Sequence, residues 1–129
     1  MAQDANILVV DDEEVMRDFL QDVLESFDVE LACDGEQAIS LLEEKSYNLI
    51  ITDMKMPGKS GEDVVRFAKG KYPDSKIIII SGYSTLSSVS NALKFGVDAF
   101  IAKPFTIKQI RTEVAKSLSA ESGSNQIGA

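Results

Sequence analysis

The sequence of 129 residues contains no histidine, a single cysteine and no block of lysine or arginine. Without histidine, the chain cannot build a histidine-based zinc site, a Ser-His-Asp triad or a phosphohistidine of its own. Cys33 stands alone, so no intrachain disulfide can form, which fits a reducing cytoplasm. Purely aliphatic runs such as residues 77–80 are far too short to span a bilayer. These absences exclude several enzyme classes and argue against a membrane protein.

The formal net charge is −8. An acidic chain without a basic block is a poor candidate for direct binding of DNA or of an anionic membrane. The N-terminal segment is polar and shows no signal-peptide pattern, so we expect a cytoplasmic protein. The length suits one domain with a real core, expected at residues 1–118. Residues 119–129 are mostly small and polar, which predicts a flexible tail or the start of a linker.

Apolar runs alternate along the chain with segments whose apolar residues have helical spacing. This alternation predicts an α/β fold, a doubly wound five-stranded parallel sheet with helices on both faces. The run at 77–80 does not alternate and should be a central strand, whereas 29–33 alternates and suits an edge. The expected strands are residues 6–10, 29–33, 48–52, 76–81 and 98–102.

Helix starts carry local capping signals, each a polar residue with a partner three positions later. A glycine at position 96 follows an expected helix as a C′ residue. The pairs are Asp34 with Gln37, Ser60 with Asp63, and Thr106 with Gln109.

Charged residues follow three of the expected strands. Asp11 and Asp12 follow the first strand, Asp53 the third and Lys103 the last. In an open parallel sheet the ligand crevice lies beyond the carboxyl ends of the strands. Three carboxylates gathered there would repel one another and would call for a cation or for protonation.

Each of these residues also has a simpler interpretation. Asp53 could accept hydrogen bonds from loop amides instead of acting as a carboxylate nucleophile. The run of four acids at 11–14 could serve only to cap a helix and favour its first turn. Lys103 could be a surface lysine, and Ser81 could belong to a turn. Considered together, the carboxylates form a hard-oxygen site that suits Mg²⁺ and does not suit a soft metal.

Related α/β families need motifs that this chain lacks. A flavodoxin phosphate loop would be small and rich in hydroxyls, but the acidic residues 11–14 would repel a phosphate. Neither the Gly-x-x-x-x-Gly-Lys-Ser/Thr loop of nucleotide hydrolases nor a dinucleotide fingerprint is present. A haloacid-dehalogenase-type phosphatase needs Asp-x-Asp, whereas Lys55 stands two positions after Asp53.

The chain resembles a response-regulator receiver domain of two-component signalling over about residues 6–118, because five segments of that family occur here in the same order. The resemblance implies a flavodoxin-like (βα)5 fold with strand order 2-1-3-4-5, the order found in a chemotaxis member of the family. The matching segments are Asp11-Asp12, Thr52-Asp53-Met54-Lys55-Met56-Pro57-Gly58, Gly61, Ser81 and Lys103-Pro104-Phe105.

The resemblance also implies a role for each site residue. Asp53 would accept the phosphoryl group, and Lys103 would pair with the phosphoryl oxygens. Asp12 and Asp53 would hold Mg²⁺ directly together with the backbone carbonyl of Lys55, and Asp11 would act mainly through water. The peptide bond between Lys103 and Pro104 would be cis, since an X-Pro bond has little preference for trans.

The resemblance further implies a switch. Ser81 would move to bond the phosphate, and the rotamer of Phe100 would follow. The output face would comprise the helix at 85–95, the strand at 98–102 and the helix at 106–118. Phe100 has no hydroxyl, so it cannot make the hydrogen bond of a tyrosine at that position.

The expected function is a signalling switch with weak self-phosphotransfer and autodephosphorylation activity, not an enzyme with a separate substrate. Its partners would be a sensor histidine kinase and a downstream effector domain or target protein, and phosphorylation could drive dimer formation. The alternative is a pseudo-receiver or constitutive docking module that never carries phosphate. Intact Asp12, Asp53 and Lys103 argue against that alternative.

Overall fold

The computed structural model describes residues 5–56, 58–82, 90–91 and 93–123. Its strands are all parallel and form one sheet in the order β2-β1-β3-β4-β5. The expected α/β fold and strand order are therefore confirmed, with β2 at an edge and β4 inside the sheet. The strands are β1 (Asn6–Val10), β2 (Asp28–Ala32), β3 (Leu49–Asp53), β4 (Lys76–Ser81) and β5 (Ala99–Ala102).

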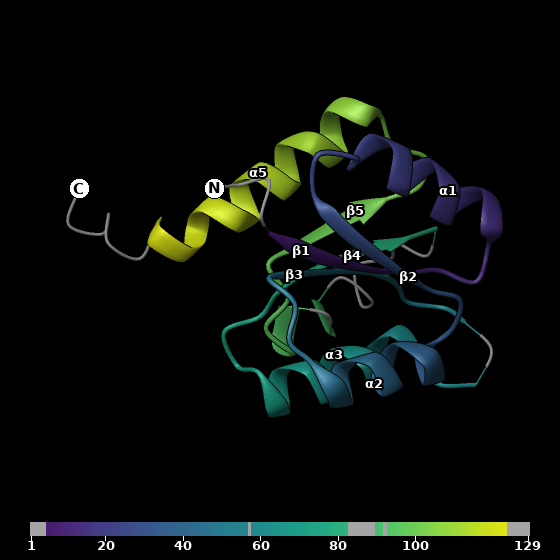
Figure 1. The fold of residues 1–129 in the computed structure, drawn as a ribbon, viewed down its shortest axis with the longest axis vertical. Helices are drawn as coiled ribbons and strands as arrows, with labels where there is room; N and C mark the ends of the chain where they lie inside the picture. The colour runs from purple at the N-terminus through teal and green to yellow at the C-terminus, as the bar shows by residue number, and fades with distance from the viewer. Residues whose placement is uncertain (1–4, 57, 83–89, 92, 124–129) are drawn as a thin grey trace.

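Helices cover both faces of the sheet, α1 and α5 on one face and α2 and α3 on the other (Figure 1). Successive side chains of a strand point to opposite faces, so each inner strand contributes to two apolar clusters. In β4, Ile77 and Ile79 pack in the α2/α3 cluster, and Ile78 and Ile80 in the α1/α5 cluster. The helices are α1 (Glu14–Val23), α2 (Gly35–Glu44), α3 (Gly61–Lys71) and α5 (Ile107–Gly123).

The expected capping pairs are present. The Asp34 side chain accepts from the Gln37 amide at 2.8 Å. Thr106 and Gln109 bond reciprocally, each side chain accepting from the other backbone amide at 2.7 and 3.0 Å. Ser60 forms a full capping box at the start of α3. These side chains satisfy amides that the first helical turn leaves without partners.

Several element boundaries differ from the sequence expectations. β2 ends one residue early because the Cys33 amide donates to the Gln37 side chain at 2.6 Å and not to a strand. The strand ending at Asp53 extends one residue further, since Asp53 is in register with Ile80. α5 continues to Gly123, five residues past the expected domain end at 118.

The helix expected at residues 85–95 lies mostly outside the described residues and carries no label in Figure 1. Residues 90–91 and 93–94 are helical. Gly96 has a positive φ of 86° and its amide donates to the Leu93 carbonyl at 3.1 Å, as expected of a C′ glycine. No helix in the described ranges is long and apolar enough to cross a membrane.

Candidate functional site

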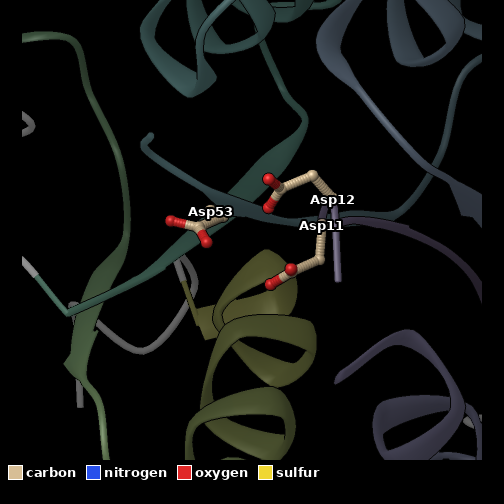
Figure 2. Close-up of side chains that lie close together, drawn as sticks. All are labelled: Asp11, Asp12 and Asp53. Carbon is tan, nitrogen blue, oxygen red and sulfur yellow. The ribbon is translucent and has the colours of Figure 1, made fainter. Parts of the chain in front are cut away.

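Three carboxylates meet beyond the carboxyl ends of two neighbouring strands. Asp11 and Asp12 follow β1, and Asp53 is the last residue of β3, which pairs with β1. One carboxylate oxygen from each of the three lies within 4.8 Å of the others. Figure 2 shows the three side chains projecting into the same space from the two strand ends. The structure thus brings together the three acids that the sequence pattern selected.

Asp11 is the most deeply buried of the three, with 2% of its surface exposed, whereas Asp12 is exposed. Its Oδ1 atom accepts from the Glu13 amide at 2.9 Å. Burial raises the pKa of Asp11, and the negative charge of Asp53 adds to this. The Glu13 amide and the Lys103 ammonium oppose the rise in that pKa without cancelling it. Ionised Asp11 is therefore held at a free-energy cost in the absence of a further cation.

Lys103 supplies the positive charge of the site. Its Nζ atom lies 3.0 Å from Asp53 Oδ2, 3.5 Å from Asp11 Oδ2 and 3.6 Å from Glu13 Oε1. The Lys103 amide donates to the Ser81 carbonyl at 2.9 Å, which places the lysine directly after β5 and beside the end of β4. The pKa of Lys103 is raised, because the bond to Asp53 and the nearby acids outweigh the opposing effect of burial.

The peptide bond between Lys103 and Pro104 is cis, as the family resemblance implies.

The loop from β3 to α3 holds Asp53 from the other side. The Lys55 amide donates to Asp53 Oδ1 at 3.2 Å, so the two carboxylate oxygens have different partners. The Gly61 amide donates to the Met54 carbonyl at 3.0 Å. A Cβ atom on Gly61 would collide with the Asp53 carbonyl oxygen and approach Met54 Cα to 2.8 Å. Only glycine fits where the first turn of α3 lies against this loop.

The two expected switch residues lie on the adjoining strands. Ser81 ends β4, one position after the residue paired with Asp53, and is fully buried. Phe100 lies in β5, is half-buried and packs against the apolar cluster under α2 and α3. The strands carrying Asp53, Ser81 and Phe100 are consecutive in the sheet, which gives a short physical path between these residues.

Glu13 and Arg17 were not selected as site residues from the sequence. Glu13 is the N-cap of α1 and makes no side-chain cap, because its carboxylate faces Lys103 instead. Arg17 donates from Nη1 to the Asp11 carbonyl oxygen at 2.8 Å. One signal was available, since Arg17 is the first cationic residue of the chain and lies one helical turn after the acidic run.

The donor set fits a hard divalent cation. Three carboxylates and one lysine leave two negative charges in a largely buried site. Mg²⁺ prefers oxygen ligands, in particular one or two carboxylates completed by water and a phosphate group. The residues described here contribute no sulfur or imidazole ligand to the cluster.

Fold and site together define a doubly wound α/β domain with an acidic cluster and a lysine at the carboxyl end of its sheet. The family model for the response regulator receiver domain matches residues 7–115. The chain belongs to this family.

Individual relatives agree with this assignment. A putative NtrX-like response regulator of Rickettsia bellii is 36% identical over 104 residues, which cover 78% of this chain and 22% of that protein. The response regulator protein PilR of Pseudomonas aeruginosa is 33% identical over 113 residues, which cover 86% of this chain and 25% of PilR. The chain thus spans a quarter or less of the length of these curated relatives.

Solved structures show the same fold. A CheY-like receiver domain protein from Methanospirillum hungatei superposes with a TM-score of 0.89 at 26% identity, covering 94% of this chain and 98% of that one. NtrX from Brucella abortus, crystallised with ATP, superposes with a TM-score of 0.87 at 26% identity. That match covers 99% of this chain and 29% of NtrX.

Proposed function

We propose that the chain is a phosphorylation-activated signalling switch that accepts a phosphoryl group on Asp53 from a histidine kinase in a Mg²⁺-dependent reaction. One observation carries the proposal. Asp53 is held with one carboxylate oxygen on the Lys55 amide and the other 3.0 Å from the Lys103 ammonium, inside a cluster of acids. A nucleophile is thereby fixed beside a cation that can neutralise incoming phosphoryl oxygens.

In the proposed reaction, a carboxylate oxygen of Asp53 attacks phosphorus in line, and the bond from phosphorus to the donor breaks. Lys103 stabilises the charge on the transferring group and then pairs with the bound phosphoryl oxygens. Asp12, Asp53 and the Lys55 carbonyl would hold Mg²⁺, with Asp11 acting through water. When bound, Mg²⁺ supplies charge neutralisation between the carboxylates and the phosphoryl oxygens. The same arrangement would give the weak self-phosphotransfer and autodephosphorylation of such a switch.

The signal would leave the site through Ser81 and Phe100. A phosphoryl group on Asp53 adds a charge of about −1.5 to −2 and strong acceptors. A new bond from Ser81 to these acceptors would exist in only one state, and such a difference in interaction is what shifts an equilibrium. Phe100 would then respond through packing alone. The output face would be the segment 85–95 with β5 and α5.

The partners of the whole protein follow from the same proposal. A sensor histidine kinase would supply the phosphoryl group, and a downstream effector domain or target protein would read the output face. Phosphorylation could also drive dimer formation through that face. The acidic chain itself would bind neither nucleic acid nor membrane. We place the protein in the cytoplasm.

Phosphorylation of Asp53 can be tested by intact-mass measurement after treatment with acetyl phosphate and Mg²⁺. One base-labile adduct is expected on the wild type and none on Asp53→Asn, which is nearly isosteric. Asp22→Asn removes the same charge from an exposed position on α1 and should leave the adduct unchanged. An adduct on Asp53→Asn would overturn the assignment. Absence of any adduct on the wild type would favour the docking-module alternative.

The proposed relay of the signal through Ser81 and Phe100 can be tested separately by backbone NMR of the phosphorylated protein. Chemical-shift changes should concentrate in residues 81–105 and leave α2 nearly silent. Ser81→Ala should still be phosphorylated on Asp53 but show smaller changes in that segment. The relay is wrong if α2 shows the largest changes, or if Ser81→Ala leaves the pattern intact.

A further inference from the structure

Arg17 is the fourth residue of α1, and its guanidinium reaches back to the end of β1. Its Nη1 atom donates to the carbonyl oxygen of Asp11 at 2.8 Å. Helical side chains tilt toward the N-terminus of their helix, so a residue in the first turn can reach the strand that precedes it. A cation near a helix N-terminus is disfavoured by the helix dipole. The stability of α1 therefore does not by itself explain why an arginine stands here.

The sequence around Arg17 is acidic, yet its bond goes to a neutral oxygen. Glu13, Glu14 and Asp18 are close to it along the chain. Within the described part of the chain, none of these acids forms an ion pair with the half-buried Arg17. A guanidinium is shaped to bind carboxylates with two parallel bonds. Its use on a backbone carbonyl is therefore a specific placement, and the group that it holds is the end of β1.

The bond from Arg17 completes a set of four contacts that fix Asp11. The Asp11 amide donates to the Ala32 carbonyl at 3.1 Å, which continues the pairing of β1 with β2. Its Oδ1 atom accepts from the Glu13 amide at 2.9 Å, and its Oδ2 atom lies 3.5 Å from Lys103 Nζ. The carbonyl is the remaining polar group of the residue, and Arg17 binds it. The backbone and the side chain of Asp11 are thus both held.

The carbonyl of Asp11 belongs to the same peptide group as the amide of Asp12. A peptide group is planar, so a bond that fixes its carbonyl also fixes the direction in which the chain enters the next residue. Asp12 is itself exposed, and its carboxylate is one of the three in the acidic cluster. The orientation of the Asp11 carbonyl therefore determines where the Asp12 side chain begins and which way it leaves the backbone.

We propose that Arg17 is a positioning residue for the cation site, which it orients through the peptide group between Asp11 and Asp12. The proposal rests on the proposed function, in which Asp12 holds Mg²⁺. Arg17 touches neither the cation nor the phosphoryl group. It holds the peptide group so that the Asp12 carboxylate stays in the space that it shares with Asp53 (Figure 2).

The affinity for Mg²⁺ tests the proposal, because the two effects of an arginine on a nearby cation have opposite signs. Its positive charge repels the cation, so charge alone would make the loss of Arg17 strengthen binding. Positioning makes the loss of Arg17 weaken binding. Amide NMR titration of the full chain with magnesium chloride, at an ionic strength kept constant with sodium chloride, gives the Kd. Arg17→Gln should raise this Kd about tenfold, the lower end of the typical loss when an outer-shell partner of a metal ligand is removed.

Two further variants make this test specific. Arg111→Gln removes the same charge from an exposed position on α5 and should not raise the Kd. Arg17→Met keeps the aliphatic stem of the arginine and should lose as much affinity as Arg17→Gln, so it decides the question if Arg17→Gln does not fold. A Kd at or below the wild-type value in the folded Arg17 variants would overturn this proposal alone. Failure of the wild type to bind Mg²⁺ would overturn it together with the proposed function.

A second measurement needs no metal. The residual dipolar coupling of the Asp12 N–H bond reports the orientation of the peptide group between Asp11 and Asp12 relative to β1. In the metal-free wild type this coupling should fit the structure together with the couplings of β1. In Arg17→Gln it should depart from that fit, while the couplings of β1 remain. An Asp12 coupling that stays the same in Arg17→Gln would overturn the proposal even if Mg²⁺ binding were weaker, because the effect would then not pass through the peptide group.

Discussion

At the scale of single residues, Lys103 contacts more charged groups of the site than any other described side chain does. It lies within 3.6 Å of the carboxylates of Asp11, Glu13 and Asp53, and its own side chain is only 20% exposed. Low exposure strengthens these attractions relative to those of surface ion pairs. Loss of the ammonium would leave several partly buried acids with no cation among the contacts described here.

Lys103→Gln should slow phosphorylation of Asp53 by acetyl phosphate at least about tenfold, since one charge-assisted contact to the transferring group is removed. The rate is measured by intact mass at fixed Mg²⁺. Lys116→Gln, on the surface of α5, is the matched control and should react like the wild type. Equal rates for Lys103→Gln and the wild type would show that the lysine does not stabilise the transfer.

A second charged group ties the edge strand β2 to the sheet. Glu30 Oε1 accepts from the Tyr47 hydroxyl at 2.5 Å and lies 2.8 Å from Lys45 Nζ. The hydrogen bonds from Lys45 and Tyr47 lower the pKa of Glu30, and burial together with Glu30 raises the pKa of the buried Tyr47. A lowered carboxyl pKa contributes stability above the unfolded value of 4.5 and loses it as the pH falls through the folded value.

Glu30→Gln should therefore lower the free energy of unfolding at pH 7 by about 0.5 kcal/mol, a small value because the Glu30 side chain is 39% exposed and screened by solvent. The difference from the wild type should be complete above pH 4.5 and disappear as the pH falls through the lowered pKa of Glu30. Urea unfolding at several pH values measures this. Glu62→Gln, which breaks only the exposed pair with Arg66, serves as the control. A constant difference down to pH 3 would contradict the assignment.

At the scale of elements, the start of α3 determines where Asp53 lies. Ser60 and Asp63 cap each other's amides, and the bond from the Ser60 backbone lowers the pKa of Asp63. The same turn brings Gly61 against the backbone of Asp53 and Met54. The start of α3, the loop that follows Asp53 and the end of β3 are therefore packed as one unit.

Gly61→Ala should destabilise the protein by about 2 kcal/mol or more, because its new Cβ atom meets backbone that cannot yield easily. Gly70→Ala offers a control within the same helix. No atom lies within 4 Å of a Cβ at Gly70, so that change should stabilise by about 0.5–1 kcal/mol through helix propensity. Urea unfolding of both variants measures the contrast. If both alanines stabilise, the close approach at Gly61 is not real.

Elements with strong local signals could be predicted from the sequence, and those set by distant contacts could not. β1 and β4 have the bounds expected from their apolar runs, residues 6–10 and 76–81. Apolar residues at helical spacing run from Met16 to Phe27 in the sequence, but α1 ends at Val23. Leu24 and Phe27 lie in the turn after α1 and pack in the same apolar cluster as Leu20 of that helix. The spacing of apolar residues indicates which face of a helix is buried, but it does not indicate where the helical hydrogen bonding ends.

The same distinction between local signals and distant contacts applies to the candidate site. Asp11, Asp12, Asp53 and Lys103 could be selected because parallel strands bring their carboxyl ends to one edge. The difference in burial between Asp11 and Asp12 could not be predicted from the sequence, since it depends on how α1 and the loop after β5 cover the end of the strand.

At the scale of the whole molecule, acids are concentrated beyond the carboxyl ends of the strands, where Asp11, Asp12 and Asp53 lie together. The acidic end should oppose folding when no cation is bound, because its carboxylates repel one another in a partly buried site. A cation that binds only the folded state relieves this repulsion and stabilises the fold by mass action. Folding stability is thus a direct readout of the acidic cluster.

Mg²⁺ should raise the melting temperature of the wild type in a concentration-dependent way. At ten times the Kd, the expected gain is about 1.4 kcal/mol, or roughly 5 °C in Tm for a domain of this length. Asp12→Ala removes one carboxylate of the cluster and should abolish most of this gain while raising the Tm measured in EDTA. Asp22→Ala removes an exposed acid elsewhere on α1 and should keep the full response. Thermal unfolding in EDTA and across a Mg²⁺ series measures all three proteins. Because all three share the same general salt effect, an identical response in Asp12→Ala and the wild type would mean that Mg²⁺ acts elsewhere and that the cluster is not its site.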